Sequence, residues 1–257
     1  MASSYSSSSS SSSPLGSMFE RPFNVQALLK ANDITLDVQR HLVNVYAALA
    51  ATVLACAVGA AIDLYAHVGG LLTTVAGMGT LLWLRLDNDQ SNYPKRSGIL
   101  LLFGLLQGFS LGSLIDLVLE VDPSILVTAL LATTTVFVCF AGAALFAKRR
   151  SYLYLGGILS SAVTVMLMVS VANIFMRTQF LFGVQLYAGL AMFCGYVVFD
   201  TQLIVEKASL GERDFAWHAA ELFIDFVAIF VRICIILLRN RSDRSSRKER
   251  HGNTYRR

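Results

Sequence analysis

The sequence predicts an all-α membrane protein, folded as a bundle of seven membrane helices. Of the 257 residues, 55% are hydrophobic and 15% are charged, whereas soluble domains carry about 25% charged residues. Six uncharged runs follow one another, each near the ~20 residues that cross a hydrocarbon core as a helix. A seventh apolar segment, 215–238, is interrupted by Glu221, Asp225 and Arg232. These segments leave no room for a separate soluble domain, so we expect one membrane domain over 41–239.

The residues before that domain fall into two parts. Residues 1–23 are rich in serine, and the first 17 contain neither Lys nor Arg nor an apolar core. A signal peptide needs a basic start followed by an apolar run, so we expect a disordered tail instead. In residues 24–40, apolar Val25, Leu28 and Leu29 recur among charged residues. This pattern predicts an amphipathic helix at the membrane interface before the first span.

The six uncharged spans are expected at about 41–62, 67–84, 97–119, 124–147, 152–175 and 182–205. The first is rich in alanine and the second in glycine, small residues that allow close contact between helices. The second ends at Trp83 and Arg85, an aromatic and a cation suited to the membrane interface. Asp122-Pro123-Ser124 separates the third span from the fourth, since proline is tolerated in a first turn, where its missing N–H has no partner to lose.

Basic residues orient these spans. They lie before the first span and after the second, fourth and sixth: Arg21, Lys30, Arg40, Lys95, Arg96, Lys148, Arg149, Arg150, Lys207 and Arg213. The opposite loops hold only Arg177, so the positive-inside rule places the N-terminus in the cytosol. Eight of the 21 Lys and Arg lie from Arg239 to the end, however, and a crossing seventh segment would put them on the other side. Either this segment is re-entrant or the protein breaks the rule; we expect a seventh embedded helix and favour a cytosolic tail.

Two carboxylates, Asp200 and Asp225, lie inside consecutive apolar segments. Acids near a bilayer centre are costly and usually mark an ion or proton path. Counting from the expected helix stop at Gly211, Asp200 is 11 residues back and Asp225 is 14 residues on, which puts them within about one turn of the same depth. Two carboxyl groups in contact would share a proton, latching the helices when protonated and admitting a cation when ionised. The alternative is a purely structural pair of acids, or an Asp225 paired with a basic residue.

Further charged residues are candidate partners for the acids. Glu221 precedes Asp225 by four residues and Arg232 follows it by seven, so both share its helix face. We therefore expect Glu221 and Arg232 as possible members of an ion-pair network with the aspartates.

Enzymatic readings fit poorly. An intramembrane aspartyl protease is expected to show Gly-x-Gly-Asp at its second acid and a later proline motif, but Leu222-Phe223-Ile224 precedes Asp225 and all four prolines lie earlier. The Gly-x-Ser-x-Gly pattern at 108–112 lies inside an apolar span, where helix packing explains it better than a nucleophile elbow does. We therefore expect that the protein is not an enzyme.

Metal and disulfide sites also find no support in the spacing of cysteines and histidines. Cys56, Cys139, Cys194 and Cys234 each sit alone in an apolar segment, and we expect packed thiols. The histidines are scattered without metal-ligand spacing; His67 and His218 are pH-sensing candidates, although interfacial polar residues are commoner. We expect no cofactor and no structural metal.

The C-terminal segment 240–257 is expected to be a basic, disordered tail. Its candidate contact residues, with the preceding arginine, are Arg239, Arg241, Arg244, Arg247, Lys248 and Arg250. They would attract anionic lipid headgroups, or together with the apolar residues before them form a calmodulin target. We expect membrane lipids as partners and no nucleic acid, and the oligomeric state stays open.

Four stretches resemble the Bax inhibitor-1 family of transmembrane Bax-inhibitor-motif proteins. They are VDPSIL at 121–126, AKRRSYLYLGGILSS at 147–161, FDTQLIVEKA at 199–208 and LFIDFVAIFVRI at 222–233. The resemblance implies seven helices with the last one central, in the endoplasmic reticulum membrane. It also implies suppression of stress-induced programmed cell death and, for some members, a pH-dependent calcium leak in which calcium is the transported ion.

The resemblance carries over to individual residues. The family's paired acids fall on Asp200 in FDTQ and Asp225 in FIDF, and Arg85 matches an arginine that pairs with the acids in prokaryotic relatives. The resemblance to plant members implies that the basic tail contacts calmodulin. The expected function is thus a cell-death suppressor with a proton-gated calcium leak. The alternative is a non-conducting scaffold that acts through Bcl-2-type or endoplasmic-reticulum stress proteins.

Overall fold

The computed structural model describes residues 35–87, 92–147, 153–176 and 178–254, and from residue 243 onwards only the backbone. Within these ranges the regular structure is entirely helical. The helices are α3 (Leu36–Ala66), α4 (Leu71–Leu86), α5 (Tyr93–Val121), α6 (Pro123–Phe146), α7 (Leu155–Met176), α8 (Gln179–Ser209) and α9 (Phe215–Thr254). The predicted all-α class is therefore confirmed for the described part of the chain.

Five of these helices, α3, α5, α6, α7 and α8, are long and apolar enough to cross a membrane. The chain is thus a multi-pass membrane protein. α4 is apolar but only 16 residues long, and α9 carries charges along its length, so seven crossings stay a prediction.

The structure differs from the sequence reading at both ends of the membrane domain. α3 begins at Leu36, so the last residues of the expected interfacial helix belong to the first long helix; residues 24–34 and the serine-rich 1–23 lie outside the described residues. At the other end α9 continues to Thr254, through most of the segment expected to be a disordered tail. Arg, Lys and Glu are good helix formers, and Asp243 stands four residues before Arg247, a spacing that supports a helix.

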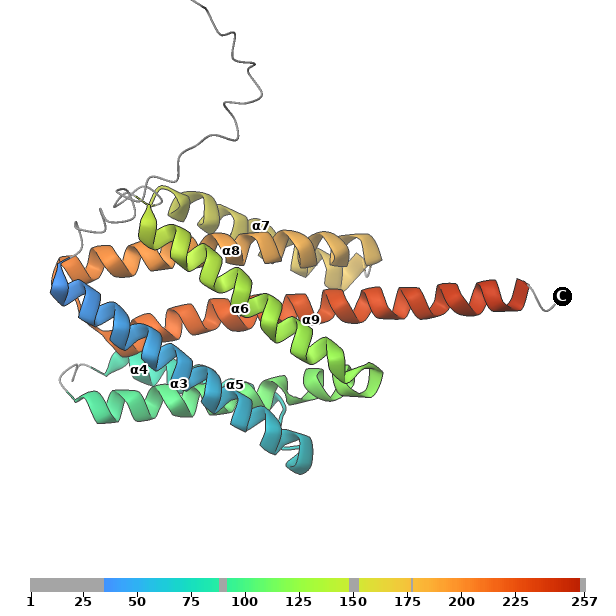
Figure 1. Cartoon of the computed structure of the whole chain (residues 1–257), viewed down its shortest axis with the longest axis horizontal. Helices are drawn as coiled ribbons and strands as arrows, with labels where there is room; N and C mark the ends of the chain where they lie inside the picture. The colour runs from blue at the N-terminus through green and yellow to red at the C-terminus, as the bar shows by residue number, and fades with distance from the viewer. Residues whose placement is uncertain (1–34, 88–91, 148–152, 177, 255–257) are drawn as a thin grey trace, which may run out of the picture. The chain divides into compact units, whose positions relative to one another are not determined.

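α9 is the central helix. It packs against α3, α4, α5, α6 and α8, and Figure 1 shows it lying between α8 and the pair α3 and α5. Thirteen of its residues, from Ala216 to Cys234, are buried. α7, by contrast, has one buried residue, Leu159, and packs mainly on α8. Figure 1 also shows the C-terminal turns of α9 extending past the other helices.

The two ends of α9 lie at opposite ends of the helix bundle. Its beginning is tied to the beginning of α3, where Arg213 Nη2 stands 3.4 Å from Asp37 Oδ2. Its far part is tied to the turn between α5 and α6, where Arg241 pairs with Asp122. An unbroken helix joins these points, so the re-entrant alternative is wrong: α9 runs the length of the bundle and does not return.

Glycines bring α5 against α3. A Cβ at Gly104 would stand 2.7 Å from the Thr52 carbonyl oxygen, and one at Gly108 would stand 2.8 Å from the Ala60 nitrogen and overlap Cys56. Only glycine permits this approach of two backbones. Gly108 belongs to the Gly-x-Ser-x-Gly pattern, which therefore serves helix packing, as expected.

Candidate functional site

The turn between α8 and α9 sets the position of the two aspartates. Gly211 adopts φ +98°, a conformation that other residues rarely take, and the chain reverses there. α9 then runs back along α8, and Asp200 and Asp225 come within hydrogen-bond reach of each other. The meeting of the two acids, predicted from their spacing, is therefore present in the structure.

One carboxylate oxygen of this pair lacks a hydrogen-bond donor among the described residues. Asp225 is 4% exposed, and Asp200 is half-buried. In the described part of the chain, Asp225 Oδ2 receives no hydrogen bond from any N–H or hydroxyl group. A proton held between the two carboxyl groups satisfies such a pair, because the protonated acid donates to the ionised one. Without that proton, two negative charges face each other at the α8–α9 contact.

Glu221, one turn away on α9, belongs to a cluster with Trp217, Lys207 and Arg85. Its Oε1 accepts a hydrogen bond of 2.6 Å from Trp217 Nε1 and stands 4.0 Å from Lys207 Nζ. The Arg85 guanidinium lies over the Trp217 ring, 5.2 Å from its centroid. Arg85 thus belongs to the Glu221 cluster, and among the described ion pairs none joins it to Asp200 or Asp225.

Arg232 does not pair with the aspartates either. Its guanidinium lies on α8, 4.4 Å from the centroid of the Phe193 ring, and its Nη1 donates to the Ala228 carbonyl oxygen at 2.9 Å. The structure therefore brings Asp200 and Asp225 together, places Glu221 close by, and sets both candidate arginines apart from the pair.

Two buried polar contacts at the start of α9 were not predicted. Arg96, 1% exposed, donates from Nη2 to Asp214 Oδ2 and from Nη1 to the Asp87 carbonyl oxygen at 2.8 Å. His41 and His218 form a hydrogen bond of 3.0 Å. Arg96 looked like a loop charge because polar residues surround it, and the histidines are 177 positions apart. No local sequence pattern predicts either contact.

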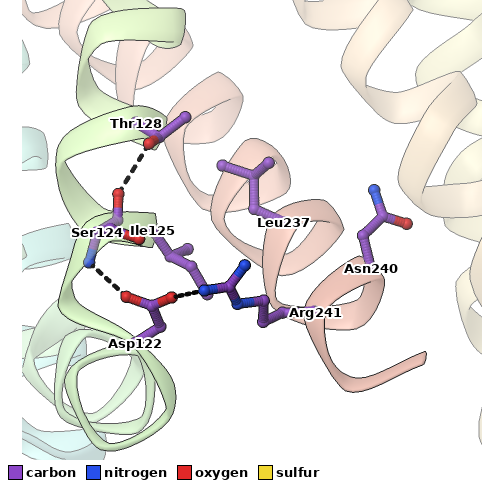
Figure 2. Close-up of a pocket in the computed structure, with 7 residues that line it drawn as sticks. All are labelled: Asp122, Ser124, Ile125, Thr128, Leu237, Asn240 and Arg241. Atoms are coloured by element: carbon purple, nitrogen blue, oxygen red, sulfur yellow. Dashed lines mark hydrogen bonds and ion pairs between the residues drawn. The ribbon is translucent and has the colours of Figure 1, made fainter. Parts of the chain in front are cut away.

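The basic end of α9 touches the bundle through Arg241. Figure 2 shows the Asp122 carboxylate between the Ser124 nitrogen and the Arg241 guanidinium. These residues line a pocket of about 180 Å³, completed by Ile125, Thr128, Leu237 and Asn240. The hydrogen bonds from Ser124, and then the Arg241 charge, hold the pKa of Asp122 below its ordinary value.

Of the remaining predicted residues of the basic segment, only the position of Arg239 is described. Arg239 faces α8, where a Cβ added at Gly183 would stand 3.5 Å from its Nη1. The side chains of Arg244, Arg247, Lys248 and Arg250 lie outside the described part of the structure. Across the described residues, no group of three or more His, Cys, Asp or Glu side chains is placed to hold a metal ion.

Comparison with known proteins agrees with the motifs. The family model described as "Inhibitor of apoptosis-promoting Bax1" matches residues 38–243. Bax inhibitor 1 of Bos taurus is 43% identical over 234 residues, which cover 90% of this chain and 99% of that protein. Bax inhibitor 1 of Arabidopsis thaliana is 44% identical over 225 residues, covering 87% of this chain and 91% of that protein, and the Homo sapiens protein is 41% identical over 235 residues. The chain belongs to the Bax inhibitor 1 family.

Proposed function

We propose that this protein suppresses stress-induced programmed cell death from the endoplasmic reticulum membrane, and that it does so as a pH-dependent calcium leak. Membership of a family described as inhibiting apoptosis-promoting Bax1 supports the first part. The contact between Asp200 and Asp225 in the α8–α9 interface is the single observation that carries the second.

The chemistry of the leak follows from the sharing of a proton. With one proton between them, the carboxyl groups bind each other and hold α8 against α9. Loss of that proton leaves two like charges in contact, which separates the helices and attracts a cation. Calcium prefers carboxylate and carbonyl oxygens at 2.3–2.6 Å, so an ionised pair is a suitable transient ligand. The leak should therefore rise as the pair loses its proton.

The test is calcium efflux from liposomes that contain the purified protein, measured across pH for wild type, Asp200→Asn and Asp225→Asn. Asparagine keeps the size of the side chain and removes its charge. Asp116→Asn is the matched control, because Asp116 is an exposed acid on α5, away from the α8–α9 contact. We expect a pH-dependent leak in wild type and in the control, and a lost or flat response in the other two variants.

The proposed orientation constrains the partners of the basic end of α9. We propose a cytosolic N-terminus from the distribution of basic residues. Because α9 runs the length of the bundle, Arg241 then emerges on the lumenal side, which replaces the cytosolic tail favoured from the sequence and makes the eight Lys and Arg from Arg239 onwards an exception to the positive-inside rule. Anionic lipid headgroups are the partner that fits there. Calmodulin contact would require the reverse orientation. Protease protection of tags at the two termini in sealed microsomes distinguishes these arrangements.

A non-conducting scaffold is the second candidate. The part of α9 that extends past the other helices supports it, because a projecting basic helix presents a surface for lipids or for Bcl-2-type and stress-response proteins. Equal efflux from wild type and from both aspartate variants would overturn the leak and leave this candidate.

A further inference from the structure

We infer that Arg232 is the fixed positive charge that restricts cation flow along the α8–α9 interface; this role rests on the proposed leak. Arg232 follows Asp225 by seven residues on α9, and its ring partner Phe193 precedes Asp200 by seven residues on α8. Since the two helices run antiparallel, the contact between Arg232 and Phe193 lies ~10 Å along the interface from the aspartates. A cation that leaves the acid pair in this direction meets Arg232.

Two residues of α8, Gly189 and Phe193, set the position of the Arg232 guanidinium. A Cβ at Gly189 would stand 2.6 Å from Arg232 Nε and 3.2 Å from its Nη2, so the absence of a side chain there makes room for the charged group. Phe193 contributes its ring face at 4.4 Å, and the Ala228 carbonyl oxygen accepts from Nη1 at 2.9 Å. The space at Gly189 and the Phe193 ring, both on α8, together with the Ala228 carbonyl of α9 itself, thus hold a planar cation between the two helices.

The charge on Arg232 is not neutralised by an acid. Among the ion pairs of the described residues, none involves Arg232. Arginine does not lose its proton in proteins, so the charge persists at every pH at which the leak would operate. An arginine within an apolar segment is costly, and such residues usually serve a function.

Electrostatic repulsion by Arg232 should affect calcium efflux and potassium efflux to different extents. The energy of repulsion is proportional to the charge of the ion, so a divalent cation is hindered more than a monovalent one. At a separation near 10 Å and an effective dielectric constant near 20, removal of the charge is expected to raise potassium efflux about 15-fold and calcium efflux by about the square of that factor. A change in packing alone would alter both fluxes alike.

The experiment measures calcium and potassium efflux from liposomes for wild type, Arg232→Gln and Arg232→Lys, each with and without Asp225→Asn. Size-exclusion chromatography and circular dichroism verify folding. We expect Arg232→Gln to leak more, with calcium favoured, and Arg232→Lys, which keeps the charge, to stay near wild type. If Arg232→Gln does not fold, Gly189→Ala replaces it, because the added methyl displaces the end of a flexible side chain from the interface.

The outcomes separate this inference from the proposed leak. If wild type leaks through the aspartates but the neutral Arg232 variant, or Gly189→Ala in its place, conducts both ions as wild type does, the role of Arg232 is overturned and the leak stands. If wild type shows no ion efflux, Arg232→Gln does, and Asp225→Asn abolishes that efflux, then Arg232 is the barrier. The leak proposed for wild type is then rejected. If no variant leaks, both fail.

Discussion

The imidazole rings of His41 and His218 are hydrogen-bonded to each other, with 3.0 Å between His41 Nε2 and His218 Nδ1. The rings meet edge to face, with an interplanar angle of 84°. His41 lies near the start of α3 and His218 near the start of α9, and their exposed fractions are 5% and 0%. This contact joins the first long helix to the central helix that carries Asp225.

Replacing both histidines should cost less stability than the sum of the two single replacements. In His41→Phe or His218→Phe, the remaining imidazole is buried without its partner, at a cost of about 1–3 kcal/mol. The double variant places two aromatic rings at the same site and leaves no unpaired polar group, so its loss should be smaller than the sum of the two single losses. Thermal unfolding of the purified protein in detergent measures this. Strict additivity would show that the rings do not depend on each other.

Close packing of α5 on α3 predicts opposite effects for two glycines of one helix. Gly108→Ala should lower the free energy of unfolding by about 1–3 kcal/mol, since the new methyl would meet the backbone of α3 at Cys56 and Ala60. Gly98→Ala is the control on the same helix. Gly98 is exposed and has open space around it, so alanine should be neutral or stabilise by up to about 1 kcal/mol. Equal effects in thermal unfolding would contradict the predicted approach of the two helices.

The parts of the fold that the sequence predicts are those governed by local composition. Uncharged runs mark the long helices, and the Asp122-Pro123 pair marks the boundary between α5 and α6, where Asp122 indeed accepts a hydrogen bond from the Ser124 nitrogen. The meeting of Asp200 and Asp225 was predictable because a short turn at Gly211 and the helical rise fix their relative depth. The extension of α9 is not predicted, because its charge and serine content are also typical of disordered segments.

The remaining contacts depend on tertiary packing. Arg96 and Asp214 are 118 positions apart, and His41 and His218 are 177 apart. No helical period or turn relates such residues; they meet because α9 lies at the centre of the bundle. The sequence predicts that Arg232 joins the acids because it shares the helix face of Asp225, but the missing side chain at Gly189 makes room for its guanidinium on α8 instead. Sequence periodicity predicts which residues share one face of a helix, but it does not predict which other helix packs against that face.

The buried ion pair between Arg96 and Asp214 should contribute far more to stability than the neighbouring pair formed by the partly exposed Lys95. Arg96→Met leaves Asp214, which is 8% exposed, without its cation, and breaking a buried pair typically costs about 3–5 kcal/mol. Lys95→Met removes the neighbouring pair with Asp87, in which the lysine side chain is 39% exposed and the aspartate side chain 9% exposed. Because Arg96 Nη1 stays 4.0 Å from Asp87 Oδ2, the loss should be only about 0–1 kcal/mol. Thermal unfolding compares the two. Adding Asp214→Asn to Arg96→Met should recover part of the loss, and no recovery would argue against an unpaired carboxylate as its cause.

The anchor of α9 at Asp122 predicts a pH-dependent contribution to stability. Hydrogen bonds from Ser124, followed by the charge of Arg241, lower the pKa of the Asp122 carboxyl from 3.8. A group whose pKa is lower in the folded state stabilises that state fully above the unfolded value, and the contribution disappears as pH falls through the folded value. Asp122→Asn keeps an oxygen acceptor for Ser124 but removes the charge, so it should unfold at a lower temperature than wild type near neutral pH.

The difference between wild type and Asp122→Asn should stay constant down to about pH 4 and then shrink as the pH falls further, because protonation converts the wild-type carboxylate into a neutral group as well. Arg241→Gln removes the ion pair with Asp122 and should give a smaller loss, since the Arg241 side chain is 54% exposed and Ser124 still donates to Asp122. Thermal unfolding across this pH range tests both variants. A difference that grows on acidification would mean that the carboxylate destabilises the fold, and the attachment of α9 to the α5–α6 turn would then depend on the apolar contacts of Leu237 and Ile125 rather than on charge.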